Sequence, residues 1–122
     1  MITGCAPSAF EGPSRLAISE LESAAYCGDV ARGVRWLDDT TLFISMGEQP
    51  TAGYGIRLAA DEVVQDDGVW LLRVHWREPG ADEPVAQVLT RPCLKVLFAE
   101  RVREPVRVMD AAGKKAILQT DD

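Results

Sequence analysis

The clearest pattern in the chain is the alternation of apolar and polar positions between residues 68 and 79. Apolar side chains occupy every second position from Trp70 to Trp76, and Arg73 and His75 lie between them. A period of two is typical of a β-strand with one buried and one wet face. An Asp-Asp-Gly turn precedes this strand. A second alternating run begins before that turn, at residues 54–58, so the two runs together predict a β-hairpin.

Other parts of the chain show short apolar runs separated by turn residues. Strands at this spacing predict an all-β, antiparallel β-sandwich or partly open barrel. The segment 15–26 has good helix formers but suits a strand equally well, so a short N-terminal helix and a further strand both remain open. The remaining expected strands lie at 33–37, 40–46, 85–90, 94–98, 106–109 and 116–118.

Composition fits one globular domain. The 122 residues are 47% hydrophobic and 26% charged, and a chain of this size can bury enough surface for a core without metal or disulfide support. We assign residues 15–122 to this domain. The formal net charge of −6 argues against nucleic acid and anionic membrane surfaces as partners, because both attract basic proteins.

The N-terminal residues 1–14 read as a flexible tether rich in Pro, Gly and Ser. The run from Ile2 to Cys5 resembles the lipobox at which bacterial prolipoproteins are lipidated on cysteine. On that basis we expect a lipid anchor on Cys5 and a place in the bacterial envelope, in the periplasm or at the outer membrane. The alternative is a coincidental match within a flexible tail.

Two cysteines remain once Cys5 is set aside. In an oxidising envelope, Cys27 and Cys93 could form a disulfide, whereas two buried thiols are the other alternative. No Cys-x-x-Cys pair and only one histidine, His75, are present, so no metal site is expected. The lone histidine and the missing nucleophile and phosphate-loop motifs also predict no enzyme activity and no cofactor.

The loop at residues 48–55 is the strongest candidate for a binding site. It is rich in glycine and holds Pro50, Thr51, Gly53 and Tyr54. Glycine permits backbone angles closed to other residues, and proline limits the freedom of the chain, so a shaped loop is expected. A structural turn with Tyr54 packed on the core is the alternative.

The order of several elements resembles the C-terminal domain of the PrcB family, over about residues 40–100. The similarity rests on the strand at 42–46, the Pro-Thr-Ala-Gly-Tyr run at 50–54, the hairpin, and the Thr-Arg-Pro run at 90–92. Ala52 and Cys93 depart from the family pattern. The family is named for a subunit of a bacterial surface protease complex. The resemblance therefore implies a non-catalytic envelope protein that binds or supports a partner such as a protease.

A fainter resemblance is to the chagasin-type inhibitors of cysteine peptidases, which present similar loops from an immunoglobulin-like sandwich. Residues 49–54 and 91–93 echo two of those loops in the same order, but Cys93 replaces an aromatic residue. Peptidase inhibition and a purely structural envelope role therefore stand as alternatives to the binding module. The residues expected at the partner contact are Pro50, Thr51, Gly53, Tyr54, Arg91 and Pro92.

Overall fold

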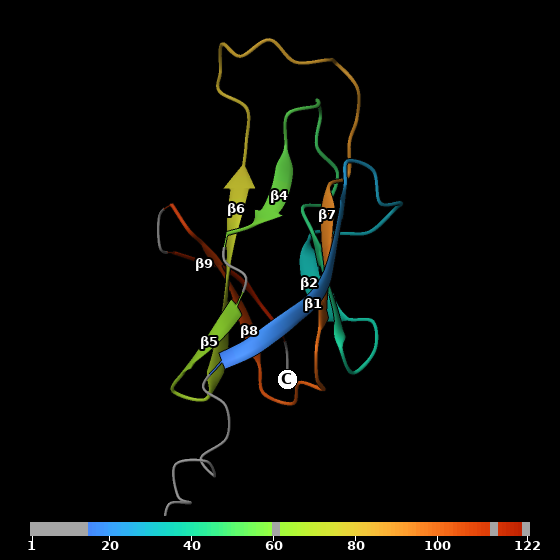
Figure 1. Cartoon of the computed structure of the whole chain (residues 1–122). Coiled ribbons are helices and arrows are strands. Elements are labelled where there is room, and N and C mark those ends of the chain that lie inside the picture. Colours follow the sequence, from blue (N-terminus) through green and yellow to red (C-terminus); the bar gives the residue numbers. More distant parts are fainter. Residues whose placement is uncertain (1–14, 60–61, 113–114, 121–122) are drawn as a thin grey trace, which may run out of the picture.

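The structure is a computed structural model that describes residues 15–59, 62–112 and 115–120 (Figure 1). Within these ranges the chain forms β-strands and no helix, so nothing there could cross a bilayer as a helical span. The segment that suited either a helix or a strand is the strand β1, which removes the helix alternative. The strands are β1 (Arg15–Ala24), β2 (Gly33–Trp36), β3 (Thr41–Ser45), β4 (Gly55–Leu58), β5 (Glu62–Asp66), β6 (Val69–Arg77), β7 (Cys93–Phe98), β8 (Val106–Asp110) and β9 (Lys115–Gln119).

The strands form one sheet in the order β2-β3-β7-β1-β5-β6-β8-β9, with β4 paired to β6 beside β5. All pairings are antiparallel except that of β6 with β8. The two ends of the order, β2 and β9, lie close to each other, so the sheet is nearly closed into a barrel. The predicted all-β, mainly antiparallel single domain is confirmed.

Strand β1 joins the two layers of this barrel. Residues 15–17 pair with β5, whereas residues from Ile18 onward pair with β7, and the register shifts between Ile18 and Glu20. A bulge of this kind bends a strand and lets it pass from one layer to the next. One layer therefore contains β2, β3, β7 and the second half of β1, and the other contains β4, β5, β6, β8 and β9.

The core lies between these layers and follows the predicted alternation on β6. Trp70, Leu72 and Val74 are buried, while Arg73 and His75 are exposed. The turn before β6 is also as predicted, since residues 67 and 68 both have positive φ, at 54° and 81°, as a type I′ turn requires. The other buried apolar residues are Leu16, Leu42, Phe43, Ile44, Met46, Ile56, Val63, Cys93, Leu94, Val96, Phe98, Val106 and Val108.

The prediction of a strand at residues 85–90 is wrong. Residues 78–92 form a long connection between β6 and β7, with isolated bridges at Thr90 and Arg91 only. No strand in the described ranges pairs with residues 85–89, and residues 86–89 are all exposed. Apolar and polar alternation over six residues therefore did not suffice to make a strand here.

Candidate functional site

Three connections meet at one end of the barrel: residues 25–32 after β1, residues 46–54 between β3 and β4, and residues 78–92 between β6 and β7 (Figure 1). We call this region the loop end. The second and third connections are joined by backbone pairing, with Gln49 N donating to Thr90 O at 2.8 Å and Thr90 N to Gln49 O at 3.0 Å. The buried Thr90 hydroxyl also donates to Thr51 O at 2.8 Å, so two long loops behave as one unit.

The first connection is fixed to the start of β7. A disulfide joins Cys27 to Cys93, with the two Cα atoms 6.0 Å apart. Beside it, Cys27 N donates to Arg91 O at 2.9 Å and Arg91 N donates to Ala25 O at 3.0 Å. Of the two alternatives that the sequence left open for these cysteines, the structure has the disulfide.

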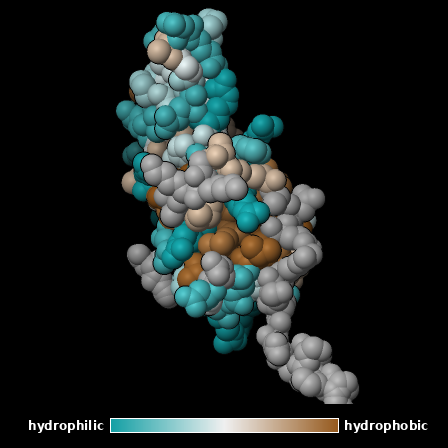
Figure 2. Space-filling view, turned by 90° about the vertical axis from the view of Figure 1, so that its left-hand side faces the viewer, coloured by the Kyte–Doolittle hydropathy of each residue, from teal (hydrophilic) through white to brown (hydrophobic). Residues whose placement is uncertain are grey.

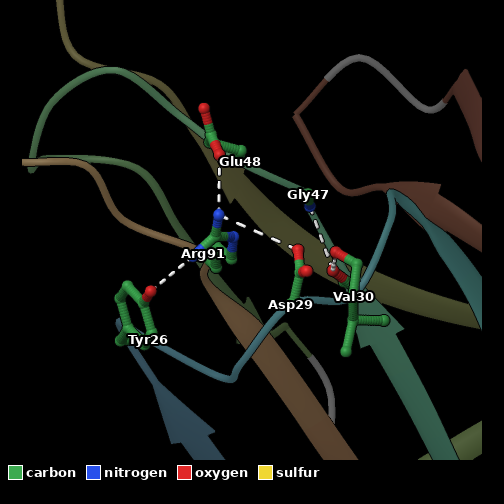
Figure 3. A network of polar contacts seen from close by, with 7 residues as sticks. Tyr26, Asp29, Val30, Gly47, Glu48 and Arg91 are labelled. Carbon is green, nitrogen blue, oxygen red and sulfur yellow. Dashed lines mark hydrogen bonds and ion pairs between the residues drawn. The ribbon is translucent and has the colours of Figure 1, made fainter.

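The guanidinium of Arg91 lies where the loops meet (Figure 3). It donates to the Tyr26 hydroxyl and to Glu48 Oε1, the latter at 2.7 Å, and it lies 3.8 Å from Asp29 Oδ1. The central carbon of the guanidinium, Cζ, lies 5.3 Å from the centroid of the Tyr26 ring. Because the Arg91 side chain is only 18% exposed, this cation holds the loops together and offers little free surface to a partner.

Two glycines shape the loop at residues 46–54. Gly47 has a φ of +76°, and a Cβ there would lie 3.0 Å from Arg32 N. Its N–H donates to Ser45 Oγ at 3.0 Å, and that hydroxyl donates to Val30 O at 3.3 Å (Figure 3). Gly53 has a φ of +99° and leaves no room for a side chain. Glycine at these two positions therefore gives the loop a defined backbone shape, as the sequence predicts.

Arg77, the last residue of β6, also connects the loop at residues 46–54 to the connection at residues 78–92. It donates to Gly53 O at 2.9 Å and forms an ion pair with Glu83 at 2.6 Å. The Gly80 N–H, which donates to the Glu83 carboxylate, and then the Arg77 guanidinium lower the pKa of Glu83 below its ordinary value of 4.5. Glu83 is therefore ionised at neutral pH and keeps the residues after β6 in a tight turn.

The predicted contact residues differ in their exposure. Pro50 is exposed, Thr51, Gly53 and Tyr54 are half-buried, and Tyr54 packs against the core. The Arg91 guanidinium is bound to Tyr26 and Glu48, as described above. Pro92 is fully buried, so its side chain cannot touch a docked protein, and it supports the loop from below.

Other residues of the loop end are more accessible, and sequence reasoning missed them. Tyr26, Val88 and Leu89 are large hydrophobic residues with 59%, 53% and 55% of their surface exposed. Tyr26 lies outside the segment that carries the family resemblance, and the alternating pattern predicts strand positions at residues 88–89. A tyrosine beside a cysteine and an apolar pair before Thr-Arg-Pro were the available signals.

Features outside the loop end offer less for chemistry. No group of three metal-ligating side chains occurs among the residues that the structure describes. His75 and Asp110 line an open hollow of about 450 Å³ with Leu71 and Met109 on the outer face of the β6 layer, and no hydrogen bond joins the histidine to the carboxylate. Figure 2 shows hydrophobic side chains gathering at mid-height on this side of the molecule, below a hydrophilic loop end. Cys5 and the tether at 1–14 lie outside the described residues.

The segment from β3 to β7 matches the model of a known family. Residues 40–98 match the PrcB C-terminal family. The sequence resemblance is thereby confirmed, with the PrcB-like region running from the start of β3 to the end of β7 and including two of the three connections of the loop end. No curated protein and no solved structure matches the chain.

Proposed function

We propose that this protein is a non-enzymatic protein-binding module that supports a partner, such as a surface or periplasmic protease, through its loop end. The observation that carries the proposal is the mutual fixation of three loops around exposed apolar side chains. A surface that is already ordered loses little conformational entropy on binding, and aromatic and aliphatic anchors supply most of the affinity in protein interfaces.

The class of partner comes from the PrcB-like region. The family suggests a role in a protease complex, and residues 40–98 contain both Pro50 and the Val88-Leu89 pair. The expected envelope location is supported by the Cys27–Cys93 disulfide, because such bonds persist in oxidising compartments. The resemblance of Ile2 to Cys5 to a lipobox agrees with the same location.

The test compares variants that leave the fixed loops in place. Val88→Ser/Leu89→Ser removes exposed apolar surface from the loop end, whereas Leu37→Ser removes a similarly exposed leucine at the β2–β3 turn, at the opposite end of β3. Tyr54→Ala is less suitable, because this ring packs on the core and its loss would disturb the fold.

Each purified variant is used to capture partners from envelope extract of the source cells, and the retained protein is identified by mass spectrometry. We expect a protease-complex component that the wild type and Leu37→Ser retain and the double variant loses. Equal retention by all three would place the binding surface elsewhere. If the domain alone inhibits a papain-like peptidase competitively, the proposed function of supporting a protease would have to be replaced by that of a peptidase inhibitor.

A further inference from the structure

The second half of β1 has a strand on one side only. Residues 18–24 pair with β7, and the contact with β5 ends at Ala17. No described strand pairs with the opposite edge of β1 beyond this point, and every residue from Ser19 to Tyr26 is exposed. An unpaired edge of this kind offers backbone N–H and C=O groups to another chain.

The direction of these backbone groups follows from the bonds on the far side of β7. Phe98 N donates to Thr40 O at 2.8 Å, and Met46 N donates to Pro92 O at 3.0 Å. Even-numbered residues of β7 therefore bond toward β3, and odd-numbered residues bond toward β1, because the direction alternates along a strand.

Within the part of the chain that the structure describes, the backbone groups of Leu21 and Ser23 on β1 have no hydrogen-bond partner. Their register partners on β7 are Val96 and Leu94, which are even-numbered and bond toward β3. The N–H and C=O of Leu21 and Ser23 consequently point away from β7, toward the open edge. Together they provide two donors and two acceptors at the spacing that an added strand requires.

The side chains give this edge a definite chemistry. Leu21 shares the face of the buried Val96 but is 47% exposed, since the opposite layer does not cover it. Glu20 and Glu22 are exposed on the outer face, and Lys95, 3.9 Å from Glu22, is the only cation recorded in an ion pair with either of them among the described residues. The edge is therefore apolar on its inner side and acidic on its outer side.

A second copy of this protein is a poor occupant. An antiparallel pair of β1 edges that used Leu21 and Ser23 of both copies would place Leu21 opposite Ser23 and Glu22 opposite Glu22. Like charges directly opposite each other in a sheet are destabilising, and each copy carries a formal charge of −6. Acidic side chains on an edge strand are a common protection against self-pairing.

We propose that the β1 edge from Glu20 to Ala24 binds an extended segment of a different polypeptide that carries Lys or Arg at alternate positions. The segment adds a strand to the sheet through Leu21 and Ser23, its cations lie beside Glu20 and Glu22, and its other face contacts Leu21. This site is separate from the loop end and does not depend on the function proposed for it.

The experiment titrates the ¹⁵N-labelled protein with capped pentapeptides in which valine alternates with lysine or with glutamate. We expect the lysine peptide to shift the amide signals of Leu21 and Ser23, to slow their hydrogen exchange and to bind at least about tenfold more tightly than the glutamate peptide, since each close charge pair changes sign. Glu20→Lys/Glu22→Lys should reverse this preference. Glu78→Lys/Asp82→Lys, with the same change in net charge on loop 78–92, should keep it.

A second variant tests the backbone bonds directly. Ser23→Pro removes an N–H that has no hydrogen-bond partner among the described residues, so the protein should still fold and bind the lysine peptide about five- to tenfold more weakly. The proposal is overturned by equal binding of the two peptides, by unchanged preference in Glu20→Lys/Glu22→Lys, by wild-type affinity of Ser23→Pro, or by no shift at about 1 mM peptide. A dimer paired through β1 in solution would also overturn it.

Discussion

Removal of the Cys27–Cys93 disulfide gives the most direct measure of what holds the loop end in place. The bond closes a loop with a sequence separation of 66 residues, which includes β2 to β6. In the chain-entropy treatment, a cross-link over this length lowers the entropy of the unfolded chain by an amount worth about 4 kcal/mol at 25 °C. Domains of this size are commonly stable by only about 5–15 kcal/mol, so the loss is a large share of the total.

The perturbation is the double variant Cys27→Ala/Cys93→Ala, compared with the oxidised wild type and with Cys5→Ala. Alanine suits both sites because Cys93 is buried and a serine hydroxyl there would add a separate penalty. Urea unfolding at pH 7 can be followed by the fluorescence of the three tryptophans, of which Trp70 is buried in the core and the other two pack against it. With a slope of about 1.3 kcal/mol per molar urea, we expect the midpoint to fall by about 3 M.

The controls separate the bond from the side chains. Wild type treated with a thiol reductant should unfold like the double variant, and Cys5→Ala should unfold like the oxidised wild type. In Cys5→Ala, thiol counting under denaturing, non-reducing conditions should find no free thiol, because the two remaining cysteines are joined. A midpoint shift smaller than about 0.5 M urea, or two free thiols in Cys5→Ala isolated from an oxidising compartment, would refute the reasoning.

Three further predictions concern single residues. Gly53→Ala should lower the free energy of unfolding by about 1–3 kcal/mol in thermal or urea unfolding, because the new Cβ would lie 2.9 Å from the Val85 side chain at a positive φ; Gly80→Ala, which meets no atom within 4 Å, should change it by less than about 0.5 kcal/mol. Arg91→Ala should cost about 1–2 kcal/mol and speed hydrogen exchange of the loop-end amides, and unchanged exchange would contradict its role as the clamp. The Trp70 indole N–H donates to Glu104 at 2.9 Å and lowers the pKa of that carboxyl below 4.5, so the carboxylate stabilises the fold above pH 4.5 and this contribution is lost as the pH falls through the lowered pKa. Glu104→Gln should accordingly be less stable than wild type at pH 7, and the difference should shrink as the pH falls below 4.5, whereas a constant difference would exclude the ionised form as the cause.

The fold was predictable wherever local pattern and burial agree. Alternation on β6 and the turn at residues 66–68 identified a hairpin, since a half-buried strand needs one apolar face and the turn needs residues that accept positive φ. Residues 85–90 show similar alternation, but their backbone meets only isolated partners such as Gln49. Whether a partner strand lies alongside depends on distant segments, which periodicity does not report.

The candidate site was predictable only in part for the same reason. The glycine-rich loop and the Arg-Pro run were identified from the sequence, but the role of Arg91 depends on Glu48, 43 residues away, and on Tyr26, 65 residues away. An arginine in a loop suggests a surface contact unless its partners are known. Here those partners bind both terminal nitrogens of the guanidinium, and the accessible residues are Tyr26, Val88 and Leu89.

The PrcB-like region needs the rest of the chain to complete its sheet. The match covers β3 to β7, yet β7 and β5 are separated in the sheet by β1, and β6 is flanked on its other side by β8. Core positions on β1 and β8, among them Leu16 and Val108, also lie outside residues 40–98. The same holds for the loop end, because the connection that carries Tyr26 and Cys27 precedes the matched region and is fixed to it by the disulfide. Both the nearly closed barrel and the proposed binding surface are therefore properties of the longer chain, and a fragment limited to residues 40–98 would leave open edges on β7 and β5 where β1 now pairs.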